Sequence, residues 1–225
     1  MGAYNVSCFE KLPGETLEDA DGSVSIAFGY GRTLGEMHNA SAAYPFAEER
    51  RDYRELMEEI GERFGRYRAP DCVLRLYDET ARALEALNRD ETVFGLIHYD
   101  FEPDNVLYDE RTDTFGIIDF DDAIRCWYAL DLARAIDAMD DVVDEDMVEG
   151  AVCAFFKGYR SVRAFSDEQA HSLPLMRRLV ALQEYATILH VLSDEVEEEP
   201  DWLLRVRKTL RNRQNEIENT YEREA

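Results

Sequence analysis

The stretch GLIHYDFEPDNVLYDERTDTFGIIDFDD, Gly95–Asp122, decides how this chain is interpreted. Short apolar runs in and beside it predict strands at Val93–Ile97, Val106–Tyr108 and Phe115–Ile118, since such runs bounded by polar clusters favour β structure. The polar segment DERTDT joins the last two and predicts a hairpin. We therefore expect a small β region over residues 93–122, in the middle of the chain.

Three polar side chains stand at fixed spacing in this β region. Asp100 and Asn105 lie on the loop between the first two predicted strands, where Pro103 opposes a helix, and Asp119 ends the next strand. Their oxygen atoms are hard ligands of the kind that Mg²⁺ prefers. A magnesium ion held by two protein ligands and by phosphates is usual in phosphoryl transfer, which leaves Asp100 to accept a hydroxyl proton. A single loop Asp or Asn more often caps a turn, so only the combination HxDxxxxN, hairpin and IDFD indicates chemistry.

Helical periodicity surrounds the β region. In the first predicted helix, Ile26, Leu34, Met37 and His38 face inward. Asp71 is expected to cap the third helix, and Ser166 with Gln169 forms a capping-box signature. The predicted helices are Val24–Ala42, Ala47–Phe64, Asp71–Leu87, Tyr128–Met139, Met147–Tyr159, Ser166 to about Leu192, and Trp202 to about Glu218. The prediction is a mainly helical α+β fold, with residues 1–225 as a single domain and a small β hairpin insertion at its centre.

Composition fits a globular protein and narrows its partners. The 225 residues are 45% hydrophobic and 11% aromatic, which excludes disorder of the whole chain. With 49 acidic and 25 basic residues the formal charge is −24. Such a surface repels nucleic acid and anionic lipid and attracts small cations, although solubility alone also explains it. We expect neither nucleic acid nor a membrane as a partner.

The sequence also predicts a cytoplasmic protein. No run approaches the roughly 20 apolar residues that a membrane span needs, and the first residues lack the pattern of a secretion signal. The four cysteines, Cys8, Cys72, Cys126 and Cys153, show no CxxC spacing. This argues against a zinc site and favours reduced thiols.

The central motif carries a family resemblance. HYDFEPDNVLYD followed by GIIDFDDA resembles the aminoglycoside phosphotransferase and choline kinase-like family, the small-molecule relatives of protein kinases. ALDLARAI resembles the segment of the family that carries a further Asp, here Asp131. CFEKLPGETLED resembles the hinge between the two lobes of these kinases, and GRTLGEMHNA the helix after it. The resemblance implies a kinase-like C-terminal lobe with a hinge segment at residues 1–14, the catalytic and metal-binding β region at 93–122, and a helical substrate side at 127–222.

The resemblance also assigns roles to residues. It implies that Asp100 is the catalytic base, that Asn105 and Asp119 bind Mg²⁺, and that His98 and Asp131 support the catalytic loop. Asp121 could contact the metal's hydration shell or a cationic substrate, or be a solvated turn acid. The backbone of the hinge would bind the nucleotide through Cys8, Phe9, Glu10 and Lys11.

The chain departs from the family pattern in two ways. Tyr99 replaces the small Gly that commonly separates the His and the Asp of the motif. No lysine precedes Lys11, so we expect the β-rich N-terminal lobe, with its phosphate loop and strand Lys, to be missing. GYGRTLG, Gly29–Gly35, has G-x-G character but lies in a helical pattern, so we predict close helix packing there.

Three functional hypotheses follow. The first is a phosphotransferase that moves the γ-phosphoryl group of ATP or GTP to a hydroxyl of a small cationic, amine-bearing acceptor, such as an aminosugar or choline. Glu184, Asp194 and the EVEEE run that follows it are candidates for amine recognition, although acidic runs are more often solvated loops. The second is a truncated or non-catalytic lobe that acts as a binding or assembly module and could form a homodimer through an exposed face. The third is a metal-dependent phosphohydrolase that uses Asp100 and Asp119. The sequence lacks the His and Asp clusters that two-metal sites usually need, which makes this hypothesis the weakest.

Overall fold

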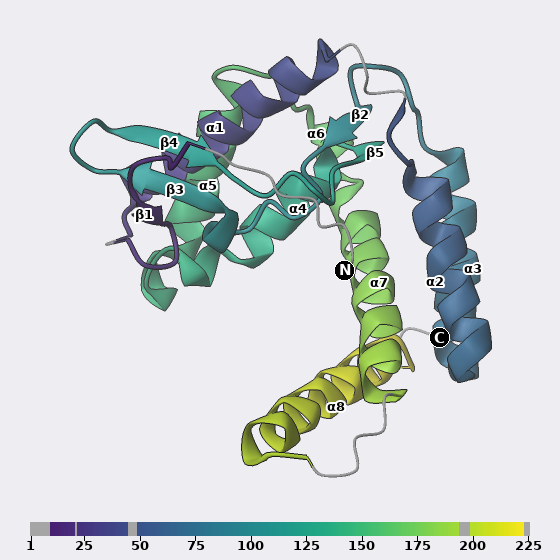
Figure 1. The fold of residues 1–225 in the computed structure, drawn as a ribbon. Helices are drawn as coiled ribbons and strands as arrows, with labels where there is room; N and C mark the ends of the chain where they lie inside the picture. Colours follow the sequence, from purple (N-terminus) through teal and green to yellow (C-terminus); the bar gives the residue numbers. More distant parts are fainter. Residues whose placement is uncertain (1–9, 21, 45–48, 194–198, 223–225) are drawn as a thin grey trace, which may run out of the picture. The chain divides into compact units, whose positions relative to one another are not determined.

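The computed structural model describes residues 10–20, 22–44, 49–193 and 199–222. Helices dominate these residues, and short strands form two separate antiparallel sheets (Figure 1). The mainly helical α+β class is therefore confirmed. No helix of the described residues is long and apolar enough to cross a membrane. The chain divides into two compact units, each built from three segments. The first unit consists of Met1–Met37, Asp100–Asp122 and Ala135–Ala164. The second unit consists of His38–Tyr99, Ala123–Arg134 and Phe165–Ala225.

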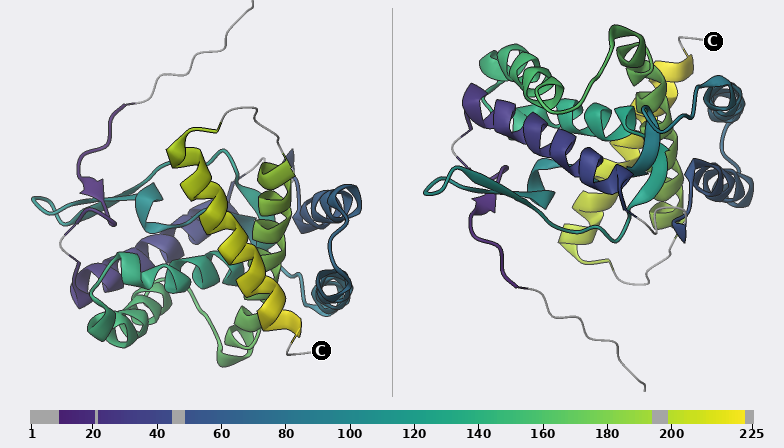
Figure 2. Two further views of the ribbon diagram at one scale, coloured as in Figure 1. Left: turned by 90° about the horizontal axis from the view of Figure 1, so that it is seen from below. Right: turned by 90° about the horizontal axis from the view of Figure 1, so that it is seen from above.

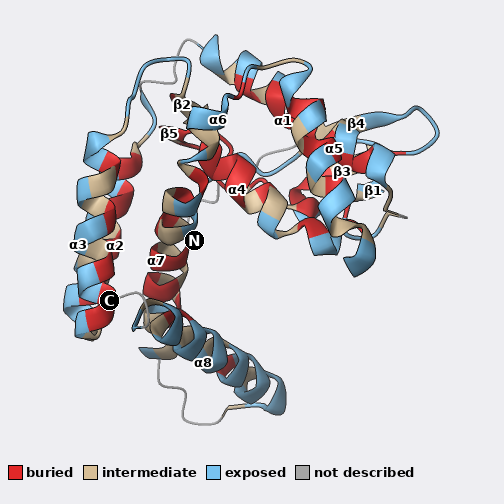
Figure 3. Ribbon diagram, turned by 180° about the vertical axis from the view of Figure 1, so that it is seen from behind, coloured by how far each residue is buried: buried red, intermediate tan, exposed pale blue. Residues whose placement is uncertain are grey.

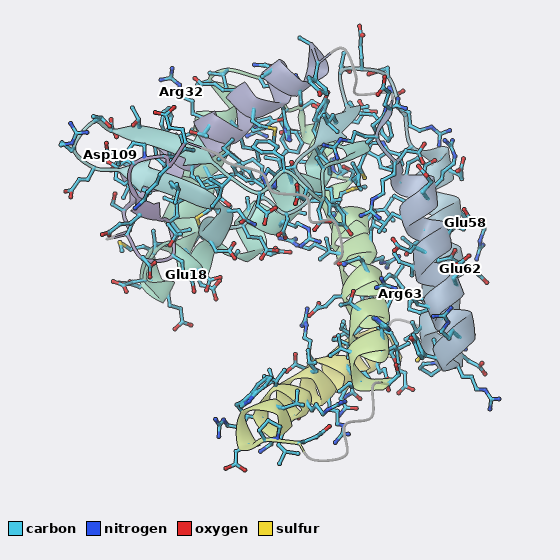
Figure 4. All side chains as sticks on the ribbon, in the orientation of Figure 1. Glu18, Arg32, Glu58, Glu62, Arg63 and Asp109 are labelled. Carbon is cyan, nitrogen blue, oxygen red and sulfur yellow. The ribbon has the colours of Figure 1, made fainter. Side chains whose placement is uncertain are left out.

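The first unit contains a sheet built on the predicted hairpin. Its strands β1 (Glu15–Thr16), β3 (Val106–Asp109) and β4 (Thr114–Ile117) pair in the order β1-β3-β4. At the tip, the Asp109 carboxylate accepts hydrogen bonds from the backbone N–H of Arg111 at 3.1 Å and from the Thr112 hydroxyl at 2.8 Å. Figure 4 labels Asp109 at this position. An Asp that binds the backbone two residues on stabilises a turn, which explains why DERTDT closes a hairpin.

Two helices of the first unit pack with their backbones in contact. α1 (Val24–Ala42) has the predicted bounds, and it meets α5 (Val148–Arg160) through glycines on both helices. A Cβ atom placed on Gly31 would lie 2.0 Å from the carbonyl oxygen of Phe155, and one placed on Gly158 would lie 1.9 Å from that of Phe28. No side chain fits at such distances, so glycine is required at this crossing. The interpretation of GYGRTLG as a helix-packing segment is confirmed.

The second unit combines a two-stranded sheet with helices. β2 (Phe94–Ile97) pairs with β5 (Ile124–Trp127) in antiparallel register. α7 (Leu173–Ser193) contacts α2 (Tyr53–Tyr67), α3 (Asp71–Ala86) and α8 (Asp201–Glu222). Figure 2 shows α2 and α3 side by side and nearly end-on. Figure 3 shows buried faces along α2 and α7, whereas α8 is mostly exposed.

The structure corrects several predictions about single elements. β5 was not predicted, and because it pairs with β2, the strands around Asp100, Asn105 and Asp119 belong to two sheets instead of one insertion. α2 begins at Tyr53, after a capping box formed by Asp52 and Glu55, and not at Ala47; residues 45–48 lie outside the described residues. The prediction that Asp71 caps α3 is wrong, because Pro70 occupies the N-cap position and Asp71 is the first helical residue.

The predicted capping box near residue 166 is confirmed, but it does not begin a long helix. Ser166 and Gln169 cap α6 (Asp167–Ala170), which ends after one turn. α7 then begins at Leu173, with Pro174 as its second residue. Proline has no N–H group and fits best in a helix's first turn, so Pro174 separates the two helices. The remaining elements are α4 (Ala129–Asp137) and 3₁₀ turns at Pro103–Asn105, Met139–Asp141 and Glu145–Met147.

Candidate active site

The loop between β2 and β3 is folded around Asp100 and Asn105. After Pro103 the chain makes one 3₁₀ turn, and the backbone N–H of Asn105 donates to the carbonyl of Glu102 at 3.0 Å. The Asn105 side chain then turns back on the loop. Its Nδ2 donates to the carbonyl oxygen and to Oδ2 of Asp100, both at 3.0 Å. These bonds fix the direction of the half-buried Asp100 carboxylate.

The same geometry leaves an oxygen of Asn105 available. The side-chain amide nitrogen faces Asp100, so Oδ1 points elsewhere, and within the described part of the chain it accepts no hydrogen bond. Asn105 is 9% exposed, but its Oδ1 is not among the buried polar atoms of the described residues that lack a hydrogen-bond partner. Oδ1 is therefore open to solvent, where a hard cation can reach it. The Asn105 side chain therefore fits a magnesium ligand.

Asp119 follows β4 and is tied to the same loop. The backbone N–H of Ile118 donates to the carbonyl of Asn105 at 3.1 Å, which places the start of the IDFD segment beside the 3₁₀ turn. Asp119 has a left-handed backbone with φ of 59°, a region that Asp enters more readily than most residues other than glycine. Its carboxylate is exposed and makes no hydrogen bond or ion pair with the residues that the structure describes. Asp121 is likewise exposed, in the turn before β5.

The candidate metal ligands are few. Among the described residues, no group of three or more His, Cys, Asp or Glu side chains is placed to hold a metal ion. Asn105 and Asp119 would supply two oxygen ligands, and Mg²⁺ in nucleotide sites is commonly held by one or two carboxylates together with phosphates and water. The donor set thus fits a cation that arrives with a nucleotide.

Aromatic packing holds the residue that follows Asp100. Phe101 is fully buried and stacks on the ring of Tyr30 in α1, with the centroids 5.0 Å apart. The Tyr30 hydroxyl donates to the Phe101 carbonyl at 3.0 Å, and Phe155 of α5 packs against the Tyr30 ring. The sequence interpretation missed both Tyr30 and Phe101. Their signal was an aromatic residue directly after Asp100, but its partner lies 71 residues earlier.

A buried carboxylate holds the residues that precede Asp100. Oδ1 of Asp131 accepts the backbone N–H of Tyr99 at 2.8 Å, and Oδ2 accepts that of His98 at 2.9 Å. Nε2 of His38, on α1, lies 3.0 Å from the same Oδ2, and both side chains are fully buried. This geometry agrees with the supporting role predicted for Asp131, which binds the backbone of the segment before Asp100. These contacts use the main chain of His98, so the supporting role of its side chain stays a prediction. His38 was missed as a partner of Asp131, although its place on the inward face of a helix was predicted.

Tyr99 lies under a guanidinium group. The centre of the Arg134 guanidinium is 4.8 Å from the centroid of the Tyr99 ring, and Tyr99 is 5% exposed. Burial raises the pKa of the Tyr99 phenol to about 12, against the opposite effect of the Arg134 charge. The phenol is therefore neutral at physiological pH. Nothing in the sequence linked these two residues.

The other predicted binding residues are placed as follows. Cys8 and Phe9 of the hinge lie outside the described residues, and Glu10 and Lys11 are exposed, so nucleotide binding by the hinge stays a prediction. Glu184 is engaged within the chain, since its two carboxylate oxygens accept hydrogen bonds from Arg213 at 2.8 and 2.9 Å. Asp194 and the next four residues are outside the described part, and the following acid, Glu199, pairs with Arg207.

Comparison with known proteins finds one family model that matches most of the chain. Residues 4–165 match the model of a family described as the phosphotransferase enzyme family. Homoserine kinase of Beijerinckia indica is 32% identical over 170 residues, which cover 68% of this chain and 48% of that protein. Amicoumacin kinase of Bacillus subtilis is 24% identical over 223 residues, covering 94% and 65%.

Solved structures show the same fold. An amicoumacin kinase in complex with AMP-PNP, Ca²⁺ and Ami superposes with a TM-score of 0.75 at 22% identity, covering 94% of this chain and 64% of that one. A microcompartment-associated aminopropanol kinase gives a TM-score of 0.64 at 19% identity, covering 96% and 66%. This chain thus spans about half to two thirds of the length of these relatives.

Proposed function

Because the chain belongs to the phosphotransferase enzyme family, we propose that it carries the catalytic residues of a small-molecule kinase. The reaction moves the γ-phosphoryl group of ATP or GTP to a hydroxyl of an amine-bearing acceptor. The observation that carries the proposal is the contact of Asn105 with Asp100, in which one amide group orients the base and turns its own oxygen outward.

Each residue of the loop has a definite task in this reaction. Asp100 accepts the proton of the acceptor hydroxyl as the hydroxyl oxygen bonds to the γ-phosphorus, while the bond from that phosphorus to the β–γ bridging oxygen breaks and the nucleoside diphosphate leaves. Asn105 and Asp119 would hold the cation through Oδ1 and the carboxylate. A Mg²⁺–nucleotide bound there would supply the phosphoryl group, and its cation would neutralise the charge that develops on the phosphoryl oxygens. Asp131 keeps the backbone before Asp100 in place through buried hydrogen bonds.

The class of acceptor is inferred from charge and from the relatives. Homoserine and aminopropanol, for which two of the relatives are named, both carry an amine and a hydroxyl. A net charge of −24 attracts a cationic acceptor. We therefore propose an amino alcohol or an aminosugar as the substrate.

A turnover assay tests the proposal. The purified chain is incubated with Mg²⁺, with ATP or GTP, and with homoserine, 1-amino-2-propanol, choline or an aminoglycoside in turn, and the phosphorylated acceptor is measured by mass spectrometry. Asp100→Asn should lower turnover by roughly 10²–10⁴-fold, the usual contribution of a general base. Asp104→Asn is the matched control, because Asp104 is an exposed acid in the same loop and should retain activity.

Two results would contradict the proposal. Equal product formation by Asp100→Asn and Asp104→Asn would exclude Asp100 as the base. Nucleotide binding in calorimetry without phosphorylation of any acceptor would favour the alternative, a non-catalytic lobe that acts as a binding or assembly module.

A further inference from the structure

Tyr99 adopts a conformation that its residue type does not favour. Its φ is 76°, in the left-handed region, where a Cβ atom is crowded and a residue other than glycine is destabilised by roughly 10-fold or more relative to its preferred conformation. The family pattern commonly has glycine at this position, and the observed φ gives the physical reason. A bulky residue between His98 and Asp100 persists only if its surroundings hold it there.

One helix supplies both of the contacts that hold Tyr99. Asp131 and Arg134 lie three residues apart on α4, a spacing that puts their side chains on the same face. The Asp131 carboxylate accepts the backbone N–H of Tyr99 at 2.8 Å. The Arg134 guanidinium lies over the Tyr99 ring at 4.8 Å, a cation–π geometry. Helix α4 therefore contacts both the main chain and the side chain of Tyr99.

The ring face of Tyr99 makes the contact of well-defined geometry with Arg134, although Arg134 also acts on the hydroxyl and opposes the rise of the phenol's pKa. Oη is buried and has no hydrogen-bond partner of good geometry among the described residues. A buried hydroxyl without a partner is destabilising, so it does not explain the presence of tyrosine. An aromatic face beneath a cation does explain it. Phenylalanine should then replace Tyr99, whereas a residue without a ring should not.

Arg134 is itself positioned by a second helix. Its Nη2 donates to Oε1 of Gln183 on α7 at 3.5 Å, and Nε2 of Gln183 lies 3.4 Å from the Thr187 hydroxyl one turn further along. The guanidinium over Tyr99 is therefore linked to α7 as well as to α4.

We propose that Arg134 and the Tyr99 ring form a clamp that sets the backbone direction entering the catalytic loop, and that Tyr99 is a positioning residue for Asp100. This inference rests on the proposed function for its effect on catalysis. Because Asp100 directly follows Tyr99, a change in the Tyr99 backbone redirects the carboxylate. A displacement of about 1 Å in a catalytic group can lower the rate roughly 100-fold.

Four variants test the clamp by steady-state kinetics. Tyr99→Gly accepts the left-handed φ but lacks the ring, and its kcat should fall roughly 10- to 100-fold while KM for the nucleotide changes less than about threefold. Tyr99→Phe keeps the ring and should restore kcat to within about threefold of the parent protein. Arg134→Gln should lower kcat as Tyr99→Gly does, and the double variant should be no worse than Tyr99→Gly alone, since both changes remove one interaction. Arg75→Gln is the charge-matched control on the exposed face of α3.

Hydrogen exchange gives a readout that needs no turnover. The amides of His98 and Tyr99, which donate to Asp131, should exchange faster in Tyr99→Gly and Arg134→Gln than in Tyr99→Phe and Arg75→Gln. Faster exchange in a chain that phosphorylates no acceptor would support the clamp while overturning the proposed function. The clamp would be overturned if the exchange rates of these amides were unchanged in both Tyr99→Gly and Arg134→Gln. A Tyr99→Gly variant with the kcat of the parent protein would overturn it as well.

Discussion

Asp131→Asn should destabilise the protein strongly, although it changes one atom. The Asp131 side chain is fully buried and accepts from Tyr99 and His98 at 2.8 and 2.9 Å, with His38 at 3.0 Å. An asparagine offers one acceptor where the carboxylate offers two. Whichever way its amide is turned, an NH₂ group then faces the backbone N–H of Tyr99 or of His98.

The magnitude follows from the bonds that are lost. One buried hydrogen bond to a charged acceptor contributes about 1.5–3 kcal/mol, and a buried N–H left without a partner costs about 1–3 kcal/mol. These terms overlap, and we expect a loss of about 3 kcal/mol in the free energy of unfolding. For a chain of this length that corresponds to a fall in Tm of about 6–12 °C.

Urea unfolding followed by tryptophan fluorescence measures the loss. Trp127 is 3% exposed in the same unit as Asp131, so its emission should change when this unit opens. Asp78→Asn, an exposed acid on α3, is the matched control and should stay within about 0.5 kcal/mol of the parent protein. A loss below about 1 kcal/mol for Asp131→Asn would refute the view that this carboxylate holds the loop.

Three further predictions concern helix packing, alkaline stability and the metal. Gly158→Ala should cost about 1–3 kcal/mol in urea unfolding, because its Cβ would lie 1.9 Å from the carbonyl oxygen of Phe28, whereas Gly65→Ala has open space and should be neutral or stabilising. The Tyr99 phenol, with a pKa of about 12 against about 10 when unfolded, contributes stability that is fully present below about pH 10 and is lost between about pH 10 and 12; Tyr99→Phe should therefore lose less stability than the parent between pH 9 and 11.5, and equal slopes would contradict this. Asp119→Asn should raise the Mg²⁺ concentration for half-maximal turnover by at least about tenfold, and an equal rise in Asp122→Asn would show that overall charge, and not coordination, is responsible.

Local sequence patterns predicted the elements whose causes are local. The helix Val24–Ala42 and the hairpin at DERTDT depend on periodicity and on turn residues that lie within the same segment. The strand β5 was not predicted, because its cause is not local. IRCW has no sustained alternation of apolar and polar residues, and it becomes a strand only by pairing with β2, some 30 residues earlier. The break between α6 and α7 has a local signal in Pro174, the second residue of α7.

The motif residues were found from their spacing, but the groups that hold them were not. Asp100, Asn105 and Asp119 lie within one short stretch, so their spacing in the sequence is enough to identify them as candidate site residues. His38 lies 93 residues from Asp131, and Tyr30 lies 71 residues from Phe101. Such contacts come from tertiary packing, and a single sequence contains no record of which buried polar groups meet.

The residues that precede Asp100 and the candidate metal ligands Asn105 and Asp119 have different surroundings, and this difference bears on function. The residues before Asp100 are buried and bound to Asp131, so the backbone enters the Asp100 loop in a fixed direction. Oδ1 of Asn105 and the Asp119 carboxylate instead make no hydrogen bond within the described residues. A structural turn would use these oxygen atoms internally, as Asp109 does in the hairpin. An Asn105 oxygen held in place by its own amide group, beside an exposed Asp119 carboxylate without an internal donor, fits a cation-binding site, and this contrast, more than the motif alone, supports phosphoryl transfer over a purely structural role.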